Sequence, residues 1–340
     1  MIDFPASPTT GQIFTSAGAS WRWDGTKWVA YGGGSSGDVG RNQLHNSTFE
    51  VRQRGPGNFT TNGAYTADRW QMQFANDTAS FSMQQSVIGA IGDDAIYWVL
   101  NGTFTGNVAA TAFTQIGQKI ENLLRLSGKT VTVSFYAYAS ATLKLGCNIY
   151  QYFGTGGSPS AGAWVQATGN AATITTSWQR FSFTYVIPSA AGKTLGTNND
   201  HFTHLLFGYS AGANANAQYG NIGVQSGTIY ISGVQLEIGS SATPLEKLEY
   251  ADDLRHCQRH YQTLSFMAQG YSPAANNLYN NTPLPVPMRA APSVTTSGVS
   301  TSNCTFLTPS TGYGHVQYAI QITATGYGYA TGTAQFSADL

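Results

Sequence analysis

Hydrophobic and polar residues alternate in several short segments of this chain, and the alternation predicts β-strands. Residues 131–138 place apolar side chains at every second position, and residues 143–150 and 180–187 follow the same rule. A period of two is typical of a strand with one buried face. Turns rich in Gly and Asn separate these segments. We therefore expect a jelly-roll β-sandwich over residues 41–240, in a mostly β protein.

One helix is predicted after the last of these strands. Thr243 is a capping residue, Pro244 suits the first helical position, and Glu246 completes a capping box. Apolar residues then recur at spacings of four and three, which is a short heptad pattern. We expect a linker and connecting helix over residues 241–264, with a trimer seam made by Tyr250, Leu254, Cys257 and Tyr261. Residues 116–124 also show helical spacing, but Gly117 weakens it, so helix and strand both stay open there.

The first 31 residues form a separate small module in this interpretation. Asp24-Gly25 predicts a two-residue hairpin turn, which places Trp21 opposite Trp28 and leaves Trp21, Trp23 and Trp28 on one face. Three tryptophans on one face of so small a unit suit an aromatic mini-core, packing on a neighbouring subunit, or an anchor that attaches the protein to a partner. The Gly/Ser-rich residues 32–40 then predict a linker.

Residues 265–340 are predicted to form a small C-terminal β domain. Residues 316–324 alternate cleanly, and residues 326–332 suit either a bulged strand or a glycine-aromatic loop. Tyr313, Tyr327 and Tyr329 adjoin glycines, where their rings can be exposed for stacking on sugars. The alternative is that these rings build an aromatic core or a well-packed sheet.

The composition narrows the classes of partner. Charged residues make up 9% of the chain and the net charge is zero, so nothing favours nucleic acid or an anionic membrane. No apolar run is long enough for membrane insertion, and residues 1–5 lack the features of a signal peptide. A surface of Ser, Thr, Asn, Gln, Gly and Tyr suits glycans or tight subunit packing. Because so little charge favours association, we expect a homotrimer.

No catalytic or metal-binding signature stands out. His256 and His260 are four residues apart on the predicted helix, but no third ligand accompanies them, so we interpret them as a polar helix face. The three cysteines do not make a disulfide framework.

Asp93-Asp94 and Asp252-Asp253 are the adjacent carboxylates, and a glycan hydrolase would need such a pair at a defined separation. Glu50 and Glu237 are further candidates. We expect no enzyme activity and no cofactor.

Several motifs in order resemble the bacteriophage tail-fibre and virion surface fibre family. They are the segment GVQLEIGSSATPLEKLEYADDLRHCQRHY at residues 233–261 and, upstream, NSTFEVRQRG at 46–55, YTADRW at 65–70, GKTVTVSFY at 128–136, FGTGGSP at 153–159 and WQRFSF at 178–183. The match covers roughly residues 42–262. It departs at His260, where the family usually has an aromatic residue, and at Arg52, where Trp is expected.

The resemblance implies a structural adhesin whose jelly roll is like that of carbohydrate-binding modules. We therefore expect residues 1–31 to attach to other virion proteins and residues 265–340 to lie distally and bind a host-surface glycan. Synthesis is expected in the bacterial cytoplasm and function on the virion surface. The alternatives are a purely structural decoration protein of a capsid or baseplate, and a tailspike enzyme that depolymerises glycans.

Overall fold

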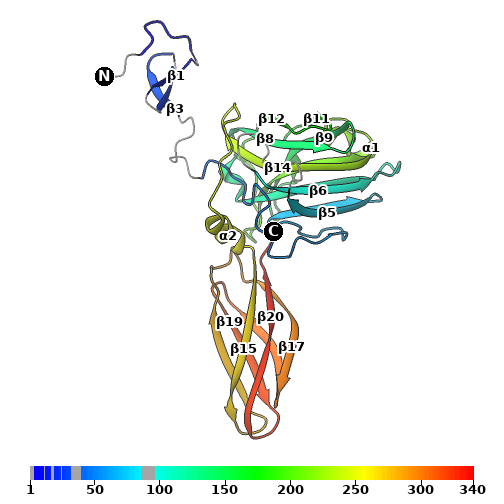
Figure 1. The fold of residues 1–340 in the computed structure, drawn as a ribbon, viewed down its shortest axis with the longest axis vertical. Helices are drawn as coiled ribbons and strands as arrows, with labels where there is room; N and C mark the ends of the chain where they lie inside the picture. Colours follow the sequence, from blue (N-terminus) through cyan, green and yellow to red (C-terminus); the bar gives the residue numbers. More distant parts are fainter. Residues whose placement is uncertain (1–3, 11, 17–18, 24, 32–39, 86–95) are drawn as a thin grey trace.

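Three β units follow one another along the chain (Figure 1). The structure is a computed structural model that describes residues 4–10, 12–16, 19–23, 25–31, 40–85 and 96–340. Apart from Gly40, the predicted linker over residues 32–40 lies outside the described residues. The prediction of a mostly β protein is confirmed, because strands make up most of the regular structure and the helices are short. None of the helices in the described residues has the length and hydrophobicity needed to cross a membrane.

The N-terminal unit is a single antiparallel sheet of β1 (Ile13–Ser16), β2 (Ala19–Trp23) and β3 (Trp28–Tyr31). The predicted hairpin register is wrong, because Trp23 itself lies opposite Trp28. Trp21 and Trp28 both contact the rings of Phe4 and Phe14, and Trp23 meets Trp28 with ring centroids 5.7 Å apart. Direct pairing of Trp23 with Trp28 keeps the tryptophans on one face and gives this unit an aromatic mini-core.

The central unit is a sandwich of two antiparallel sheets. One sheet has the order β12 (Gln179–Val186), β8 (Thr130–Ala139), β14 (Ser226–Ile238), β6 (Trp98–Thr105) and β5 (Thr78–Gln85). The other has the order β10 (Ala163–Trp164), β9 (Leu143–Tyr152), β13 (Phe202–Ala211), β7 (Phe113–Glu121) and β4 (Trp70–Ala75), and β11 (Asn170–Ile174) also pairs with β9. Short helical turns are η2 (Leu123–Arg125), α1 (Ala213–Asn216) and η3 (Ala217–Tyr219). The segment left open at residues 116–124 is thus the end of a strand followed by a 3-10 turn.

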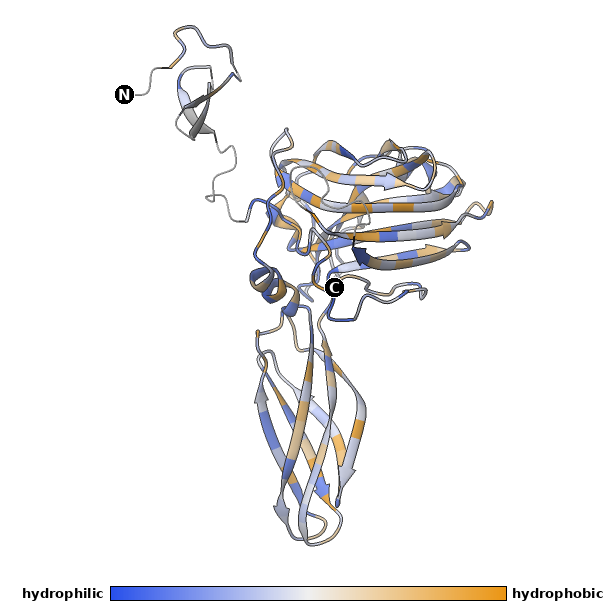
Figure 2. Ribbon diagram, in the orientation of Figure 1, coloured by the Kyte–Doolittle hydropathy of each residue, from blue (hydrophilic) through white to orange (hydrophobic). Residues whose placement is uncertain are grey.

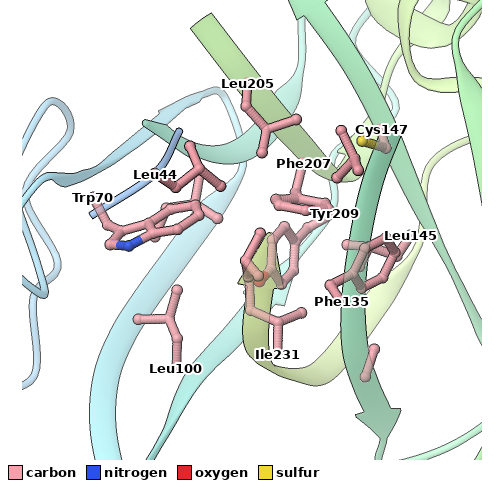
Figure 3. Close-up of a cluster of buried hydrophobic side chains, with 14 of the residues drawn as sticks. Leu44, Trp70, Leu100, Phe135, Leu145, Cys147, Leu205, Phe207, Tyr209 and Ile231 are labelled. Atoms are coloured by element: carbon pink, nitrogen blue, oxygen red, sulfur yellow. The ribbon is translucent and has the colours of Figure 1, made fainter. Parts of the chain in front are cut away.

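The two sheets enclose one large hydrophobic core (Figure 3). Phe135 of β8 and Phe207 of β13 meet across it edge to face, with ring centroids 4.9 Å apart. Trp70 is fully buried, and its indole Nε1 donates to the carbonyl of Asn46 at 3.0 Å. Hydrophobic residues alternate with polar ones along the strands of both sandwiches (Figure 2). This is the period-two pattern that the sequence predicted for β8, β9 and β12.

The C-terminal unit is a smaller sandwich of two three-stranded sheets. Its strands are β15 (Tyr261–Ser272), β20 (Gly326–Ser337) and β17 (Ser293–Ser302) in one sheet, and β16 (Asn277–Pro283), β19 (His315–Ile322) and β18 (Cys304–Thr311) in the other. A second core fills the space between the sheets, and Phe266 stacks on Tyr318 within it at 4.4 Å. The strands lie parallel to the long axis of this unit, and the unit extends away from the central sandwich (Figure 1).

The predicted connecting helix is shorter than expected, because α2 spans only Tyr250–Gln258. Thr243 caps no helix, since its N–H and hydroxyl both donate to Glu237. Glu246 accepts hydrogen bonds from the N–H groups of Gly40 and Asn42 instead of closing a capping box. Both residues of the predicted helix start are therefore used to fasten the chain to the central sandwich.

The predicted seam is also divided between two elements. Tyr261 is the first residue of β15, where Arg54 lies over its ring, 3.5 Å from the centroid. Cys257 is fully buried within the chain, whereas Tyr250 is exposed. Tyr250, Leu254, Cys257 and Tyr261 thus do not form one helical stripe, because the heptad spacing continues past the residue where α2 ends. The homotrimer itself stays a prediction.

Candidate functional site

Exposed aromatic side chains gather on one face of the C-terminal sandwich. Strand pairing places Tyr271 directly opposite Tyr327, and Gln269 opposite Tyr329. Met267 lies on the same face because it is two residues from Gln269 on β15. Tyr271 is 70% exposed, Met267 56% and Tyr327 53%. We call these five residues the tyrosine surface.

The tyrosine surface lies in the half of the unit that is farthest from the central sandwich, with Tyr271 and Tyr327 at its end. β15 begins beside the central sandwich at Tyr261, and Tyr271 is the penultimate residue at its other end (Figure 1). Tyr327 is the second residue of β20, next to the same turn. The sequence signal for this site was the glycine-tyrosine alternation. Tyr271 was missed, because only the register of β15 against β20 brings it to Tyr327.

Glycines on the opposite face explain the alternation. Gly270 lies opposite Gly328, and both face the other sheet. A Cβ on Gly328 would lie 2.7 Å from the Cδ1 of Ile322, and one on Gly270 would lie 2.7 Å from the Cδ1 of Leu278. Side chains at these positions would push the sheets apart, so the glycines allow close packing beneath the exposed rings.

Hydrogen bonds hold the tyrosine strand in place. The Tyr327 hydroxyl donates to the side-chain carbonyl of Gln269, which fixes the ring against the neighbouring strand. The Asn303 side chain donates to the carbonyls of Ala324 at 2.9 Å and Tyr327 at 3.0 Å. Asn303 thus fastens the turn from which β20 starts. The surface combines preorganised aromatic rings with amide and hydroxyl groups.

The far end of this unit carries no Asp, Glu, Lys or Arg. Residues 261–340 contain only Arg289 and Asp339 of these types. Both lie at the junction with the central sandwich, where Arg289 pairs with Glu121 and Asp339 pairs with Arg54. A ligand of the tyrosine surface therefore meets neutral groups.

Tyr313 does not belong to this surface. It lies between β18 and β19, and its carbonyl accepts from the N–H of Met288 at 2.7 Å. Thr311, at the end of β18, donates to the carbonyl of Pro292, just before β17 begins. This is the end of the unit nearest the central sandwich. Tyr313, which is 63% exposed, thus lies apart from Tyr327 and Tyr329, and its contact with a glycan stays a prediction.

The Asp68-Arg69 pair braces the junction between the two sandwiches. Asp68 accepts from the backbone N–H of Gln53 at 2.7 Å and from its side chain at 2.9 Å. Burial raises the pKa of Asp68 to about 6, against the opposing charge of Arg54. Arg69 is buried with φ at 75°, and its Nη1 lies 2.8 Å from the Nδ1 of His260. These contacts make Asp68 and Arg69 structural supports of the junction.

His256 and His260 do not share a helix face. His256 is exposed and stacks on His45 with ring centroids 4.6 Å apart. His260 lies beyond the end of α2 and is buried, which together with the nearby positive charge of Arg69 holds its pKa far below the ordinary value. The described residues contain no group of three His, Cys, Asp or Glu side chains placed to hold a metal ion.

The candidate carboxylates have different partners, although burial and, after it, the nearby charge of Glu50 raise the pKa of Asp253 to about 6. Asp252 is exposed and pairs with Arg255, whereas Asp253 is buried and accepts from the N–H of Asn46 at 2.7 Å. Glu237 is committed to Thr243 and to Gln235. Asp93 and Asp94 lie outside the described residues. The adjacent residues Asp252 and Asp253 thus differ in exposure and in hydrogen-bond partner, and their contacts are structural.

Comparisons with known proteins give structural similarities only. No protein-family model matches the sequence, and no curated protein does. A structure described as CBM4 is 20% identical over 57% of this chain and 98% of its own, with a TM-score of 0.32. TmCBM61, solved with beta-1,4-galactotriose, is 10% identical over 58% of this chain and 99% of its own, with a TM-score of 0.31.

One phage protein is also similar. The enzymatically active domain of tailspike protein 4 from bacteriophage CBA120 is 12% identical over 58% of this chain and 22% of its own, with a TM-score of 0.35. Likenesses of this size do not carry a function from one protein to another. The function of this chain has to follow from its own side chains.

Proposed function

We propose that this chain is a virion fibre protein that adheres reversibly to neutral surface glycans through the tyrosine surface. The observation that carries the proposal is the opposed, exposed pair Tyr271 and Tyr327 at the free end of the C-terminal sandwich. Sugar rings present C–H faces that pack on aromatic rings, and hydroxyls that bond to amide and phenol groups. The absence of charged residues around the pair favours a neutral ligand over an acidic one.

The rest of the chain has a supporting role in this proposal. The N-terminal unit, with its aromatic mini-core, attaches the fibre to other virion proteins. The sequence resemblance to phage fibres supports this placement on the virion surface. A homotrimer carries three tyrosine surfaces, and many copies on a particle convert weak single sites into high avidity. No catalytic step is part of the proposal.

Binding to immobilised glycans tests the proposal. Fluorescently labelled full-length protein is applied to an array of bacterial surface glycans, and bound glycans are then used as competitors against binding to cells. We expect retention on a subset of neutral glycans, without release of reducing ends. If neither glycans nor cells retain the protein, adhesion is excluded and a purely structural decoration role replaces it. Release of reducing ends would instead identify a depolymerase.

A further inference from the structure

A cavity of about 400 Å³ lies at one edge of the central sandwich, far along the chain from the tyrosine surface. β4 and β5 are the edge strands of the two sheets, and they follow one another in the sequence. Residues 59–64 cross from one edge to the other. Phe59 pairs with Phe81 of β5, and Ala64 accepts from Met72 of β4. The cavity lies where this crossing segment leaves β5.

Hydroxyl groups and phenyl rings line the cavity. Its walls carry two aromatic residues and five hydroxyl residues, which are Phe74, Phe104, Thr60, Thr78, Ser80, Thr103 and Thr105. Thr78 lies opposite Thr105 and Ser80 lies opposite Thr103 on the paired strands β5 and β6. None of the lining residues is charged. Asp77, the neighbouring acid in the sequence, is committed to the N–H of Asn107 and the hydroxyl of Thr114.

The backbone of Ala79 adds an open donor and an open acceptor. The N–H and C=O of Phe81 both bond to Phe59, so they point away from β6. Residues two apart on a strand direct their backbone groups to the same side, so those of Ala79 also point to the open edge. Thr61 would be their partner if the pairing continued, but its carbonyl accepts from Ala64 in a turn. No other described residue bonds to these two groups.

The hydroxyl side chains, the aromatic residues and the open backbone groups of Ala79 together indicate the class of ligand. An extended peptide that adds to a sheet edge needs several consecutive open positions. Here β5 begins at Thr78 and Phe59 already occupies Phe81, so Ala79 is the single open position between them. A compact ligand with an apolar face and several hydroxyls can use the partly exposed Phe74 ring, the open N–H and C=O, and the threonine hydroxyls together, whereas the Phe104 ring is buried in the core. Neutral sugars have these properties, and 400 Å³ is within the usual size range of small-ligand sites.

We propose that this edge cavity is a second saccharide site, which takes one or two neutral sugar residues independently of the tyrosine surface. It gives the protein two separate contacts with a glycan-covered surface. Two linked weak contacts raise the effective affinity of each copy when both sites are occupied together.

Nuclear magnetic resonance of the full-length chain with ¹⁵N-labelled alanine tests the site. The Ala79 amide is assigned through Ala79→Ser, and the probes are methyl glycosides of glucose, galactose, mannose and N-acetylglucosamine. We expect at least one probe to shift the Ala79 signal saturably. Val has the shape of Thr without its hydroxyl, so Thr60→Val with Thr78→Val should weaken that probe roughly tenfold. No shift up to the solubility limit, or equal affinity in the double variant, overturns the proposal.

Two control variants test whether the edge cavity binds the probe specifically and independently of the tyrosine surface. Thr173 is an exposed threonine on β11 outside the cavity, so Thr173→Val should leave the affinity unchanged. Tyr271→Ala should also leave the Ala79 response unchanged, because the tyrosine surface lies in the other sandwich. Loss of the response in either variant contradicts an independent site at the edge cavity.

Discussion

Arg289 of the C-terminal sandwich donates from Nε to the Oε1 of Glu121 in the central sandwich at 2.6 Å. The other oxygen of Glu121 accepts from the Nη2 of Arg259 at 2.8 Å. One carboxylate thus holds two guanidinium groups that follow α2 in the chain. Because Arg289 is mostly shielded from water, this pair is stronger than one on an open surface. The contact fixes the direction in which the C-terminal sandwich leaves the central one.

Glu121→Gln should weaken this junction, since the amide keeps the shape but loses the charge. We expect a loss of about 1–3 kcal/mol in the free energy of unfolding, measured by urea denaturation. Asp252→Asn is the control, because Asp252 pairs with Arg255 on the surface and should matter by less than about 0.5 kcal/mol. Equal midpoints for the two variants would show that Glu121 does not stabilise the junction.

His204 should make stability fall in acid. It is buried with no hydrogen-bond partner for Nε2 among the described residues, and burial lowers its pKa to about 3. Between pH 7 and 5 the unfolded chain takes up a proton at this residue, whereas the folded chain does not, so unfolding becomes easier. The wild type should lose about 2 kcal/mol more than His204→Gln over this range.

Urea denaturation at pH 7 and pH 5 measures this difference, and the other titrating groups are common to both proteins. Leu206→Ala is the control, because it removes buried side-chain volume on the same strand without removing a titrating group. It should lower stability by a similar amount at both pH values. A parallel pH response of wild type and His204→Gln would contradict the prediction.

Tyr271→Ala and Tyr327→Ala should each weaken glycan binding. Each ring contributes about 1 kcal/mol of stacking, so single-site affinity should fall roughly fivefold per variant. Tyr313→Ala is the matched control, because Tyr313 is equally exposed but lies at the other end of the unit. Calorimetric titration with a glycan retained on the array measures the affinities. An effect of Tyr313→Ala as large as that of Tyr271→Ala would argue against the tyrosine surface.

Gly328→Ala should destabilise the C-terminal sandwich. The added Cβ would lie 2.7 Å from Ile322 and 2.8 Å from the Asn303 carbonyl, so the sheets must move apart. We expect a cost of about 1–3 kcal/mol, seen as a lower melting temperature of this unit. Gly314→Ala is the control, because a Cβ there meets no atom within 4 Å. Similar melting temperatures for both variants would show that the sheets adjust freely.

Sequence patterns of polar residues, such as a helix-capping box, were the least reliable guide to the structure. Thr243 and Glu246 are arranged as a helix start, but Glu237 and the N–H groups of Gly40 and Asn42 take their hydrogen bonds. Gly40 and Asn42 are distant in the sequence from Glu246, and Glu237 lies on the preceding strand, β14. A capping pattern shows which bonds a residue can make, whereas the tertiary structure decides which of them it makes.

The sequence by itself determined the mostly β fold, because a period of two is a local property of each strand. It also showed that the C-terminal unit lacks charge and that Tyr327 and Tyr329 alternate with glycines. Only the tertiary structure decided which residues share a site. Strand register places Tyr271 opposite Tyr327, and the direction of the strands places Tyr313 at the opposite end of the C-terminal unit. Register and direction depend on pairing between distant segments, and that pairing is set by the packing of whole sheets.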